Sequence, residues 1–511
     1  MYIFVLVHFV FISHSHSHSH SPCFLLSRHH STILGFKMNG EDSVQAHGAT
    51  ASTTDRPPKV LISGAGLAGL LLANLLEKAN IPYEIFERAK EVLPLGSIMC
   101  LTANILPAFE QLELYDDLMK ASYPSHSTKL LSADLKRIGE FNAEEDKALT
   151  GYHRALFARP ELYKILLSRI PPQKIHLSKR VASFHQDKDG VTLEFQDNTP
   201  AVHGDILVGA DGAYSAVRQH LYQELEQQGK LPLADKRKSQ KGYICLVGTT
   251  GSLDTTKFPG VDVPASEGTL LVGDSASPYA WSTFTVPGNK ICWNVVVQLD
   301  VNASEEEKFK NSEWASTTNE KMIEKVCEFK TPYGKMGDLF DATPKDQISR
   351  VFLEDMVYET WYHSRTVLIG DAAHKLLPST GQGAVNAMQD AVVLANCLYD
   401  LESVTHENIQ AALKNFREQR YDHVKTQHEA SQFGAKIQYG HTWYERILRH
   451  IVFNYLPKSL QRNHILKDSQ YRPQVAFLPQ TANRGSGSVQ PQRPSKRYAE
   501  EQAKLSSTQA V

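Results

Sequence analysis

The chain has few cysteines and no surplus of either charge. Its 511 residues include six cysteines, and no two of them form a C-x-x-C pair. This spacing excludes the common zinc sites, a thioredoxin-type motif and a dense disulfide framework. Lys plus Arg number 54 and Asp plus Glu 56, so the basic excess of a nucleic-acid-binding protein is missing. We expect a globular protein of a reducing compartment, cytoplasmic by default, with no nucleic acid as partner.

Long hydrophobic runs are missing as well. No stretch reaches the roughly 18 apolar residues that a membrane-spanning helix needs. The apolar run at residues 2–12 has no preceding Lys or Arg and no signal-peptide cleavage cue. Alternating Ser and His residues follow at 13–21, and Met38 offers a second start. A Ser-His tract can bind transition metals weakly, but we expect residues 1–57 to be a disordered extension and predict no metal site.

Two C-terminal segments are distinctive. Apolar residues between Trp443 and Leu460 recur near helical spacing, with Arg446, Arg449 and His450 among them. This pattern fits a membrane-surface helix, and thus peripheral membrane contact, or a helix packed on the protein. Residues 480–511 are rich in Gly, Ser, Pro, Gln and charged residues, a composition that predicts a disordered tail.

The first organised stretch combines a strand, a glycine-rich turn, a helix and a second strand. Residues 59–63 form a short apolar run that leads into Gly64-Ala-Gly66-Leu67-Ala68-Gly69, and an apolar helical segment follows. A second strand ends at Glu87, 18 positions after Gly69. This order and spacing are typical of a dinucleotide-binding β-α-β unit.

Each part of that unit has a physical role. Gly64 allows the tight turn, Gly66 lets a pyrophosphate approach the backbone, and Gly69 lets the helix pack on the sheet. The N–H groups at the helix start, including those of Leu67 and Ala68, face the phosphates. The Glu87 carboxylate accepts hydrogen bonds from a ribose, which favours FAD or NAD over NADP; Arg88 beside it joins the predicted cofactor site.

Two further strands lead into acidic turns. One runs through residues 205–209 into Gly209-Ala-Asp211-Gly212, and the other through residues 366–369 into Gly370-Asp371-Ala-Ala-His374. A loop with Pro378, Gly381 and Gly383 leads from the latter into a helix that we place at 384–398. The two loop glycines permit positive φ and the close approach of a planar ring.

A different pattern separates these two turns. Residues 269–272, 279–286 and 291–299 are predicted strands, and Pro287-Gly-Asn-Lys290 is a hairpin turn. Ile291, Trp293, Val295 and Val297 share one face of the last strand. We expect an antiparallel sheet with its own functional surface, a helix over 320–329, and amphipathic helices from 401 to about 460.

In this combination the chain resembles the group A flavoprotein monooxygenases, the single-component FAD-dependent hydroxylases and epoxidases of the para-hydroxybenzoate hydroxylase type. The resemblance spans roughly residues 59–460 and includes similarity to fungal secondary-metabolite members. It implies an α/β fold: a Rossmann-like FAD-binding domain with an interleaved antiparallel-sheet substrate domain and C-terminal helices. The expected divisions are the extension 1–57, FAD-binding segments 58–225 and 346–400, the substrate domain 226–345, helices 401–465 and the tail 480–511.

The resemblance also assigns roles. By resemblance, Arg159 reaches the FAD phosphates, Asp211 and Gly212 touch FAD and the nicotinamide donor, and Asp371 binds the ribityl or pyrophosphate part. Cys100 lies where the family keeps a small residue near the flavin. The segment from Pro378 to Ala384 runs along the isoalloxazine, with Val385 where the family usually has Asn.

The resemblance implies that FAD, NAD(P)H and O2 hydroxylate or epoxidise a small aromatic or polyene/terpenoid substrate through a flavin C4a-hydroperoxide. Arg218, Tyr243 and His374 are the catalytic candidates, each with a structural alternative: an ion pair, packing and loop support. A reductase or dehydrogenase of an isoprenoid-like substrate stays open, as does a non-enzymatic FAD-binding protein. A halogenase is disfavoured because no W-x-W-x-I-P stretch occurs. The oligomeric state is undetermined.

Overall fold

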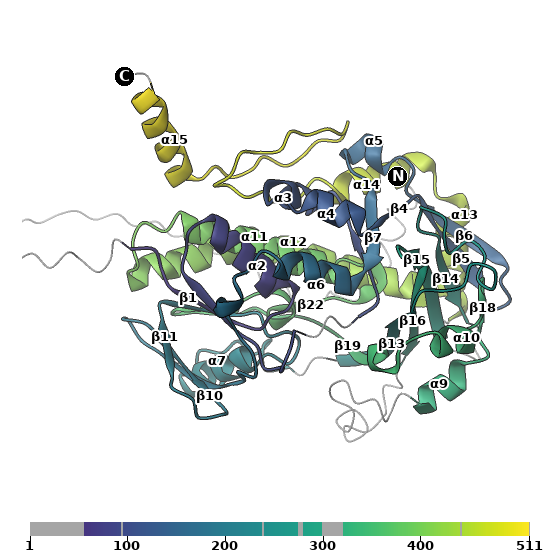
Figure 1. Ribbon diagram of the computed structural model, residues 1–511, viewed down its shortest axis with the longest axis horizontal. Helices are drawn as coiled ribbons and strands as arrows, with labels where there is room; N and C mark the ends of the chain where they lie inside the picture. Colours follow the sequence, from purple (N-terminus) through teal and green to yellow (C-terminus); the bar gives the residue numbers. More distant parts are fainter. Residues whose placement is uncertain are drawn as a thin grey trace, which may run out of the picture. The chain divides into compact units, whose positions relative to one another are not determined.

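A six-stranded sheet joins the three strands whose ends carry the glycine-rich and acidic turns (Figure 1). Its strand order is β20-β21-β12-β1-β2-β8, and all neighbours are parallel except the β20–β21 pair. The strands are β1 (Val60–Ser63), β2 (Tyr83–Phe86), β8 (Ile175–His176), β12 (Ile206–Gly209), β20 (Tyr362–His363) and β21 (Thr366–Leu368). Because β1, β12 and β21 are adjacent and parallel, their three turns meet at one edge of the sheet.

This computed structural model describes residues 56–92, 96–237, 240–273, 279–298, 320–439 and 442–509. Residues 53–511 form one compact unit. The predicted extension, with its Ser-His tract, lies outside the described residues up to residue 55.

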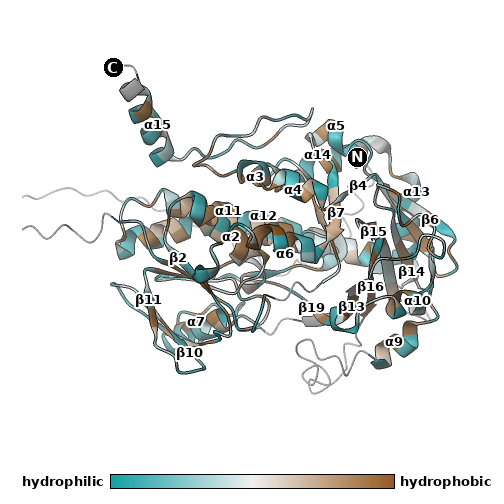
Figure 2. Cartoon of the chain, viewed as in Figure 1, coloured by the Kyte–Doolittle hydropathy of each residue, from teal (hydrophilic) through white to brown (hydrophobic). Residues whose placement is uncertain are grey.

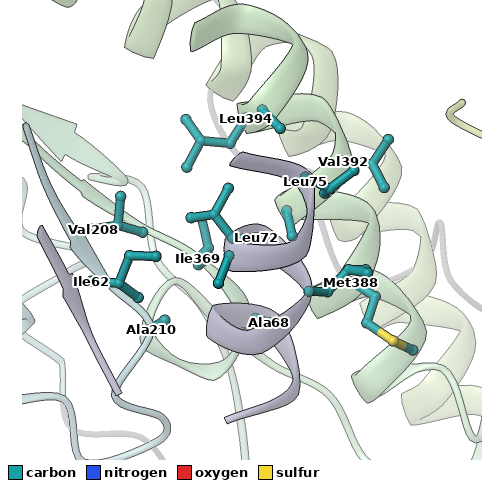
Figure 3. Close-up of a cluster of buried hydrophobic side chains, with 14 of the residues drawn as sticks. Ile62, Ala68, Leu72, Leu75, Val208, Ala210, Ile369, Met388, Val392 and Leu394 are labelled. Atoms are coloured by element: carbon teal, nitrogen blue, oxygen red, sulfur yellow. The ribbon is translucent and has the colours of Figure 1, made fainter. Parts of the chain in front are cut away.

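Two helices cover the sheet beside these turns. Helix α2 (Leu67–Lys78) follows the first turn and packs with α11 (Gly383–Tyr399), which follows the third. Figure 3 shows apolar side chains of both helices, for example Leu72 of α2 and Met388 of α11, in one buried cluster with strand residues such as Ile62. Both helices are buried along much of their length, and their hydrophobic ribbon is visible in Figure 2. Burial of this surface fixes the position of both helix N-termini at the sheet edge.

The second large sheet is assembled from distant parts of the chain. Its order is β22-β19-β13-β16-β15-β14-β5-β6; the pairs are antiparallel except β14–β5, which is parallel. The strands are β5 (Ser127–Ser132), β6 (Arg137–Asn142), β13 (Gln240–Thr249), β14 (Gly268–Val272), β15 (Tyr279–Val286), β16 (Lys290–Gln298), β19 (Ser349–Val357) and β22 (His374–Lys375). The predicted hairpin joins β15 and β16, with φ of 86° at Gly288 and 55° at Asn289.

This sheet corrects the predicted limits of the substrate domain. We expected residues 226–345, but β5 and β6 come from before that segment and β19 and β22 from after it. No sequence pattern predicted the β14–β5 pairing, which joins Gly268 to Thr128. The interleaving is therefore deeper than expected.

The two faces of this sheet have different neighbours. The predicted apolar face with Ile291, Trp293 and Val295 exists, but it packs against α9 (Glu320–Val326) and α10 (Met336–Asp341). We call the opposite side the inner face. Its residues Cys245, Ala280 and Val296 pack against Leu377 and against α12 (His406–Tyr439).

Smaller elements complete the fold. A sheet of β3 (Ile98–Leu101), β7 (Arg154–Ala158) and β4 (Tyr123–Ser125) adjoins the inner face, and β9 (Val181–Gln186), β10 (Val191–Phe195) and β11 (Val202–Gly204) form an antiparallel meander. The remaining elements include α3 (Leu106–Gln111), α4 (Tyr115–Lys120), α5 (Asp146–Thr150), α6 (Arg159–Leu167), α7 (Ala216–Gln227), β17 (Lys330–Thr331), β18 (Gly334–Lys335), α13 (Trp443–Tyr455), α14 (Lys458–Asp468) and α15 (Lys496–Gln509). Short 3-10 turns include Pro172–Lys174, Lys345–Gln347, Gly370–Ala372 and Pro378–Thr380.

The structure corrects the prediction of a disordered tail over residues 480–511. In the structure, Gly487 N donates to Leu149 O at 2.8 Å, and α15 follows at the end of the segment. Immediately before residue 480, the side chains of Val475 and Phe477 are buried in the main hydrophobic core. Composition misled the prediction because the partners that satisfy this backbone lie more than 300 residues away in sequence.

Among the described residues, no helix has the length and apolar character to cross a membrane.

Candidate active site

The first glycine-rich turn is shaped by close contacts between backbones. A Cβ on Gly64, whose φ is 104°, would lie 2.6 Å from Ala210 O, and one on Gly69 would lie 2.2 Å from Gly64 O. Only glycine fits either position. Gly66 is the N-cap of α2 and adds no side-chain cap, so the N–H groups at Leu67 and Ala68 open a positive helix end toward the sheet edge.

Glu87 follows β2 and is fixed beside this turn. Its Oε2 accepts from Ala65 N at 2.8 Å, and its Oε1 accepts from Ala89 N at 2.9 Å. Each oxygen keeps a second lone pair for another donor. This places a half-buried carboxylate where a ribose would meet it, and Arg88, the next residue, is exposed.

Arg159 starts α6 and approaches the same edge from the β3–β7 sheet. One of its terminal nitrogens contacts the Tyr163 hydroxyl at 3.4 Å, whereas its buried Nε has no hydrogen-bond partner among the described residues. Tyr163 and the carboxylate of Asp371 favour the charged guanidinium and raise its pKa. A buried cation with a spare donor suits a phosphate.

Cys100 lies on β3, opposite Leu156 of β7. Burial raises the pKa of its thiol to about 11. It therefore stays a neutral, small side chain, as the predicted role requires, and is not a reactive thiolate.

Two carboxylates mark the ends of β12 and β21. Asp211 Oδ2 accepts from Val217 N at 3.1 Å near the start of α7, while its buried Oδ1 has no partner in the described part of the chain. Burial raises the pKa of Asp211, and hydrogen bonds from Ser215 and from backbone N–H groups act against that rise. Asp371 is exposed at the end of β21. Gly212, with φ of 79°, has open space around its Cα.

The third turn continues into the segment that we expected beside the flavin ring. Gly381 has φ of 66°, and a Cβ on Gly381 or Gly383 would meet nothing within 4 Å. The prediction of positive φ is therefore confirmed at Gly381 but wrong for Gly383, which is the first residue of α11. Pro378 opens the short 3-10 turn, and Ala384 continues α11. The free space over Gly383 and the uncapped helix start remain suited to an anionic ring edge.

Helix α12 holds the segment from Pro378 to Ala384 through hydrogen bonds to Ser379. Ser379 Oγ donates to Ser431 O at 2.6 Å, and Gln438 Nε2 donates to Ser379 O at 2.6 Å. Gly434 lets the two chains approach, because a Cβ there would lie 3.1 Å from Ser379 Oγ. The loop is thus held on rigid elements.

His374 belongs to a buried ion network. Its Nε2 lies 2.6 Å from Asp390 Oδ2, which also accepts from Gly370 N at 2.9 Å. Arg420 Nε donates to Asp390 Oδ1 at 2.7 Å. Burial opposes ionisation of Asp390, but the charges of His374 and Arg420 outweigh it and lower its pKa. These contacts fit the structural alternative, support of the turn, and the catalytic role of His374 stays a prediction.

Arg218 is also a positioning residue here. Its guanidinium donates to Ala213 O at 2.7 Å and to Ala372 O at 2.9 Å, and it stacks over Tyr358. It links the second turn to the third. The predicted catalytic role is not supported, because these carbonyls and the ring occupy the side chain.

Tyr243 is the one catalytic candidate on the inner face of the large sheet. It is half-buried on β13, 5.8 Å from the Tyr439 ring, and burial raises its pKa. At physiological pH its hydroxyl is neutral, so it can donate a hydrogen bond but is a poor base.

Asn294 and Ser282 also lie on the inner face, and sequence reasoning missed both. Asn294 Nδ2 donates to Ser282 Oγ at 2.6 Å between β16 and β15. On β16, Cys292 packs with Ala158 and Val296 packs with Leu377. Asn294 therefore lies between Cys292, beside the end of β7, and Val296, beside the segment Pro378–Ala384 that we call the glycine loop. Its side chain is half-exposed.

Three buried polar atoms near the turns fit a bound FAD better than turns with only a structural role. Arg159 Nε, Asp211 Oδ1 and Thr380 Oγ1 are buried atoms without a partner among the described residues. Buried polar atoms are normally paired, so three of them around one sheet edge mark a place for a polar ligand. No cluster of potential metal ligands occurs in the described ranges.

Comparison with known families identifies that ligand. A family model described as "FAD binding domain" matches residues 58–235 and 303–431. The chain belongs to this FAD-binding family. The matched residues contain all three turns, and four of the eight strands of the large sheet lie between the two matched segments.

Fungal members of the family are similar along most of the chain. The FAD-dependent monooxygenase ausM of Penicillium brasilianum is 27% identical over 438 residues, 82% of this chain and 87% of that protein. The FAD-dependent monooxygenase atmM of Aspergillus flavus is 26% identical over 86% of this chain and 91% of its own length. These similarities confirm the predicted resemblance and the assignment as an FAD-dependent monooxygenase.

Solved structures share the fold. Klebsiella pneumoniae HpxO complexed with FAD and uric acid has a TM-score of 0.63 and 22% identity, covering 81% of this chain and 97% of that one. CtdE in complex with FAD and a substrate has a TM-score of 0.60 and 16% identity, covering 81% and 98%. The α/β FAD-binding fold and FAD as cofactor are confirmed.

Proposed function

We propose that the protein uses NAD(P)H and O2 to hydroxylate or epoxidise a small aromatic or polyene/terpenoid molecule. The observation that carries the proposal is the contact of the glycine loop with the inner sheet face. Leu377, directly before Pro378, packs on Cys245, Ala280 and Val296 of that face. The surface that would hold a substrate thus adjoins the segment that would hold the flavin ring.

FAD, when bound, would supply the redox chemistry that links nicotinamide oxidation to O2 activation. The residues of this chain bind and orient it. The adenosine end belongs to Glu87 and the start of α2, the phosphates to Arg159, and the ribityl part to Asp371. The N-terminus of α11 stabilises negative charge at the ring.

The inner face is suited to an apolar molecule with a single polar handle. Val247 and Leu353 are half-buried on it beside Tyr243, while Asn294 and Ser282 supply hydrogen-bonding groups. An apolar wall around few polar groups is the usual make-up of a small-molecule site. We place the reaction in the cytoplasm, where NAD(P)H is supplied; the five cysteines of the described residues are free thiols.

The test is oxygen transfer to product. Purified protein with FAD is incubated with NADH or NADPH under ¹⁸O2 and a panel of phenols, anthranilates, polyenes and terpenoid alkenes. We expect one panel class to stimulate NAD(P)H oxidation and to gain one ¹⁸O atom. A product that gains or loses two hydrogens without ¹⁸O would establish the reductase or dehydrogenase alternative. A yellow protein that never oxidises NAD(P)H would contradict both.

A further inference from the structure

Helix α13 presents an apolar stripe outward. Trp443, Ile447, Ile451 and Tyr455 follow one another at intervals of four residues and so share one face. Their exposed fractions are high for large apolar side chains, at 69% for Trp443, 52% for Ile447 and 68% for Tyr455. Tyr444 widens the stripe at its first turn and is also exposed. A contiguous apolar patch of this kind marks an interaction surface.

The other side of α13 is anchored to the protein. Arg449 is buried and donates to Gln438 O at 3.3 Å. Phe453 packs against Gly139 of β6, and its ring lies edge-on to Phe141 at 4.5 Å. Asn454 Nδ2 donates to Ile138 O at 2.9 Å. The helix therefore packs on β6, the edge strand of the large sheet, through the side opposite its apolar stripe.

The start of the helix is fixed by local hydrogen bonds. Thr442 and Glu445 form a capping box, in which Thr442 Oγ1 donates to Glu445 at 2.6 Å and Glu445 N donates back at 3.4 Å. The carboxylate of Glu445 is therefore held at the N-terminus of the helix by its hydrogen bonds to Thr442.

Basic residues border the stripe. Arg446 and His450 are exposed and lie one turn apart along its edge. With the buried Arg449 left out, residues 442–468, which include α14, carry four Lys or Arg and two acidic residues, a formal charge of +2 in a chain whose total is −2. Arg462 and Lys467 of α14 are exposed as well. The surface around the stripe therefore attracts anions.

We propose that α13 docks, parallel to the surface, on a membrane containing anionic phospholipids. Trp and Tyr stand at the two ends of the stripe with Ile between them, and these aromatic side chains favour the boundary between headgroups and acyl chains. An amphipathic helix with Lys or Arg beside aromatic and aliphatic residues lies in this boundary. The charge complementarity selects a lipid surface over a second copy of the chain, because two such basic patches would repel each other.

The experiment measures vesicle binding of the full-length, FAD-loaded protein. Phosphatidylcholine vesicles are compared with vesicles that contain phosphatidylserine in addition, at low and high salt. We expect binding to the phosphatidylserine vesicles that weakens as salt rises. The variant Trp443→Ser/Ile447→Ser/Tyr455→Ser should lose at least about tenfold in affinity. A variant Arg446→Glu should lose the preference for phosphatidylserine.

Matched controls separate this surface from general hydrophobicity. The triple variant Leu233→Ser/Val263→Ser/Leu505→Ser removes exposed apolar side chains elsewhere, Leu233 being 80% exposed, and should bind vesicles as the wild type does. A full-length variant Phe4→Ser/Leu6→Ser/Phe9→Ser tests the apolar N-terminal run and should also bind normally. FAD content and the melting temperature verify folding in each case.

Four outcomes would overturn the proposal. One is a wild type that binds neither vesicle; another is an α13 variant that binds as tightly as the wild type. The third is loss of binding in the N-terminal variant. If lipid-free protein were a dimer that the α13 substitutions dissociate, the surface would serve a second copy and not a membrane. None of these results depends on the substrate or on turnover, so the proposed function stands or falls separately.

Discussion

Two regions of the molecule satisfy their polar groups in different ways. One is the edge of the six-stranded sheet where the three turns meet, which we call the cofactor edge, and the other is the inner face of the large sheet. Around the cofactor edge, Arg159 and Asp211 each keep a buried atom without a partner in the described part of the chain. On the inner face, Asn294 and Ser282 are paired with each other among apolar neighbours. The first region is prepared for a specific polar ligand, whereas the second is mostly a shaped apolar wall. This contrast supports the proposal that FAD is recognised by charge and hydrogen bonds, and a substrate by shape with a few polar contacts.

The largest expected effect comes from the buried network that supports the cofactor edge. Asp390→Ala should lower the free energy of unfolding by about 3–5 kcal/mol, because Arg420 is left as an uncompensated buried charge. The Gly370 N–H loses its acceptor too, so FAD content should fall. Differential scanning calorimetry and released-flavin absorbance measure both. Asp422→Ala, an exposed residue of α12, serves as control and should match the wild type.

The same carboxylate predicts a pH dependence. Since the folded-state pKa of Asp390 is lowered, its stabilising contribution is present above its unfolded pKa of about 3.9 and is lost as the pH falls below that value. Unfolding by urea should therefore show a stability gap between wild type and Asp390→Asn at pH 6–7 that narrows toward pH 3. A gap that stays constant over this range would show that Asp390 is not charged in the folded protein.

The second effect concerns the adenosine end. Glu87→Ala should weaken FAD binding about ten- to a hundredfold, since a hydrogen bond to a charged acceptor contributes about 1.5–3 kcal/mol. The change also removes the acceptor for Ala65 N, so Glu87→Gln, which keeps one acceptor oxygen, should bind FAD with intermediate affinity. Fluorescence titration of the apoprotein gives the constants. Equal affinity in all three proteins would remove Glu87 from the site.

The third effect tests the ring end. Gly383→Val fills space that is open in the structure and should slow flavin reduction about tenfold, or raise hydrogen peroxide release, while FAD stays bound. Gly381→Val instead forces a β-branched residue to φ of 66° and should lower stability as well. Stopped-flow reduction and melting curves separate the two. An unchanged reduction rate and coupling in Gly383→Val would mean that this helix start does not face the ring.

The smallest effect lies on the inner face. Asn294→Leu should leave FAD affinity unchanged and raise the substrate KM about two- to tenfold, the loss of one ordinary hydrogen bond. Val247→Leu changes only the shape of the wall and provides the comparison. If Asn294→Leu altered FAD binding and left KM unchanged, the polar pair would belong to the cofactor edge, and the contrast between the two regions would disappear.

The sequence could predict the turns because each is a local pattern. The order Gly64 to Glu87 places strand, turn and helix within one short stretch, and the structure confirms that unit. The network around Asp390 could not be predicted, because no sequence motif links it to its partners Gly370 and Arg420, and only the packing of α11 and α12 brings them together. For the same reason the sequence could not predict the contacts by which Arg218 links two turns and His374 supports one.

The sheet faces show a second limit. Alternation identified the face with Ile291, Trp293 and Val295, which is the more regular one because helices α9 and α10 bury it. A face that adjoins a ligand is less uniformly apolar, since Asn294 and Tyr243 interrupt it. Regular alternation therefore indicated the packed side of the sheet and not the side next to the cofactor.

The strand order of the two large sheets also sets the order of assembly. The parallel sheet needs β21 at Thr366–Leu368 beside β12 near residue 206, which in turn pairs with β1 near residue 60. The mixed sheet needs β19 at Ser349–Val357 beside β13. On a ribosome, neither sheet can close until most of the chain has emerged. Unpaired strand edges are exposed for that whole period, which favours slow folding and a need for chaperones. Dividing the gene between the two regions would therefore yield two incomplete sheets and not two domains.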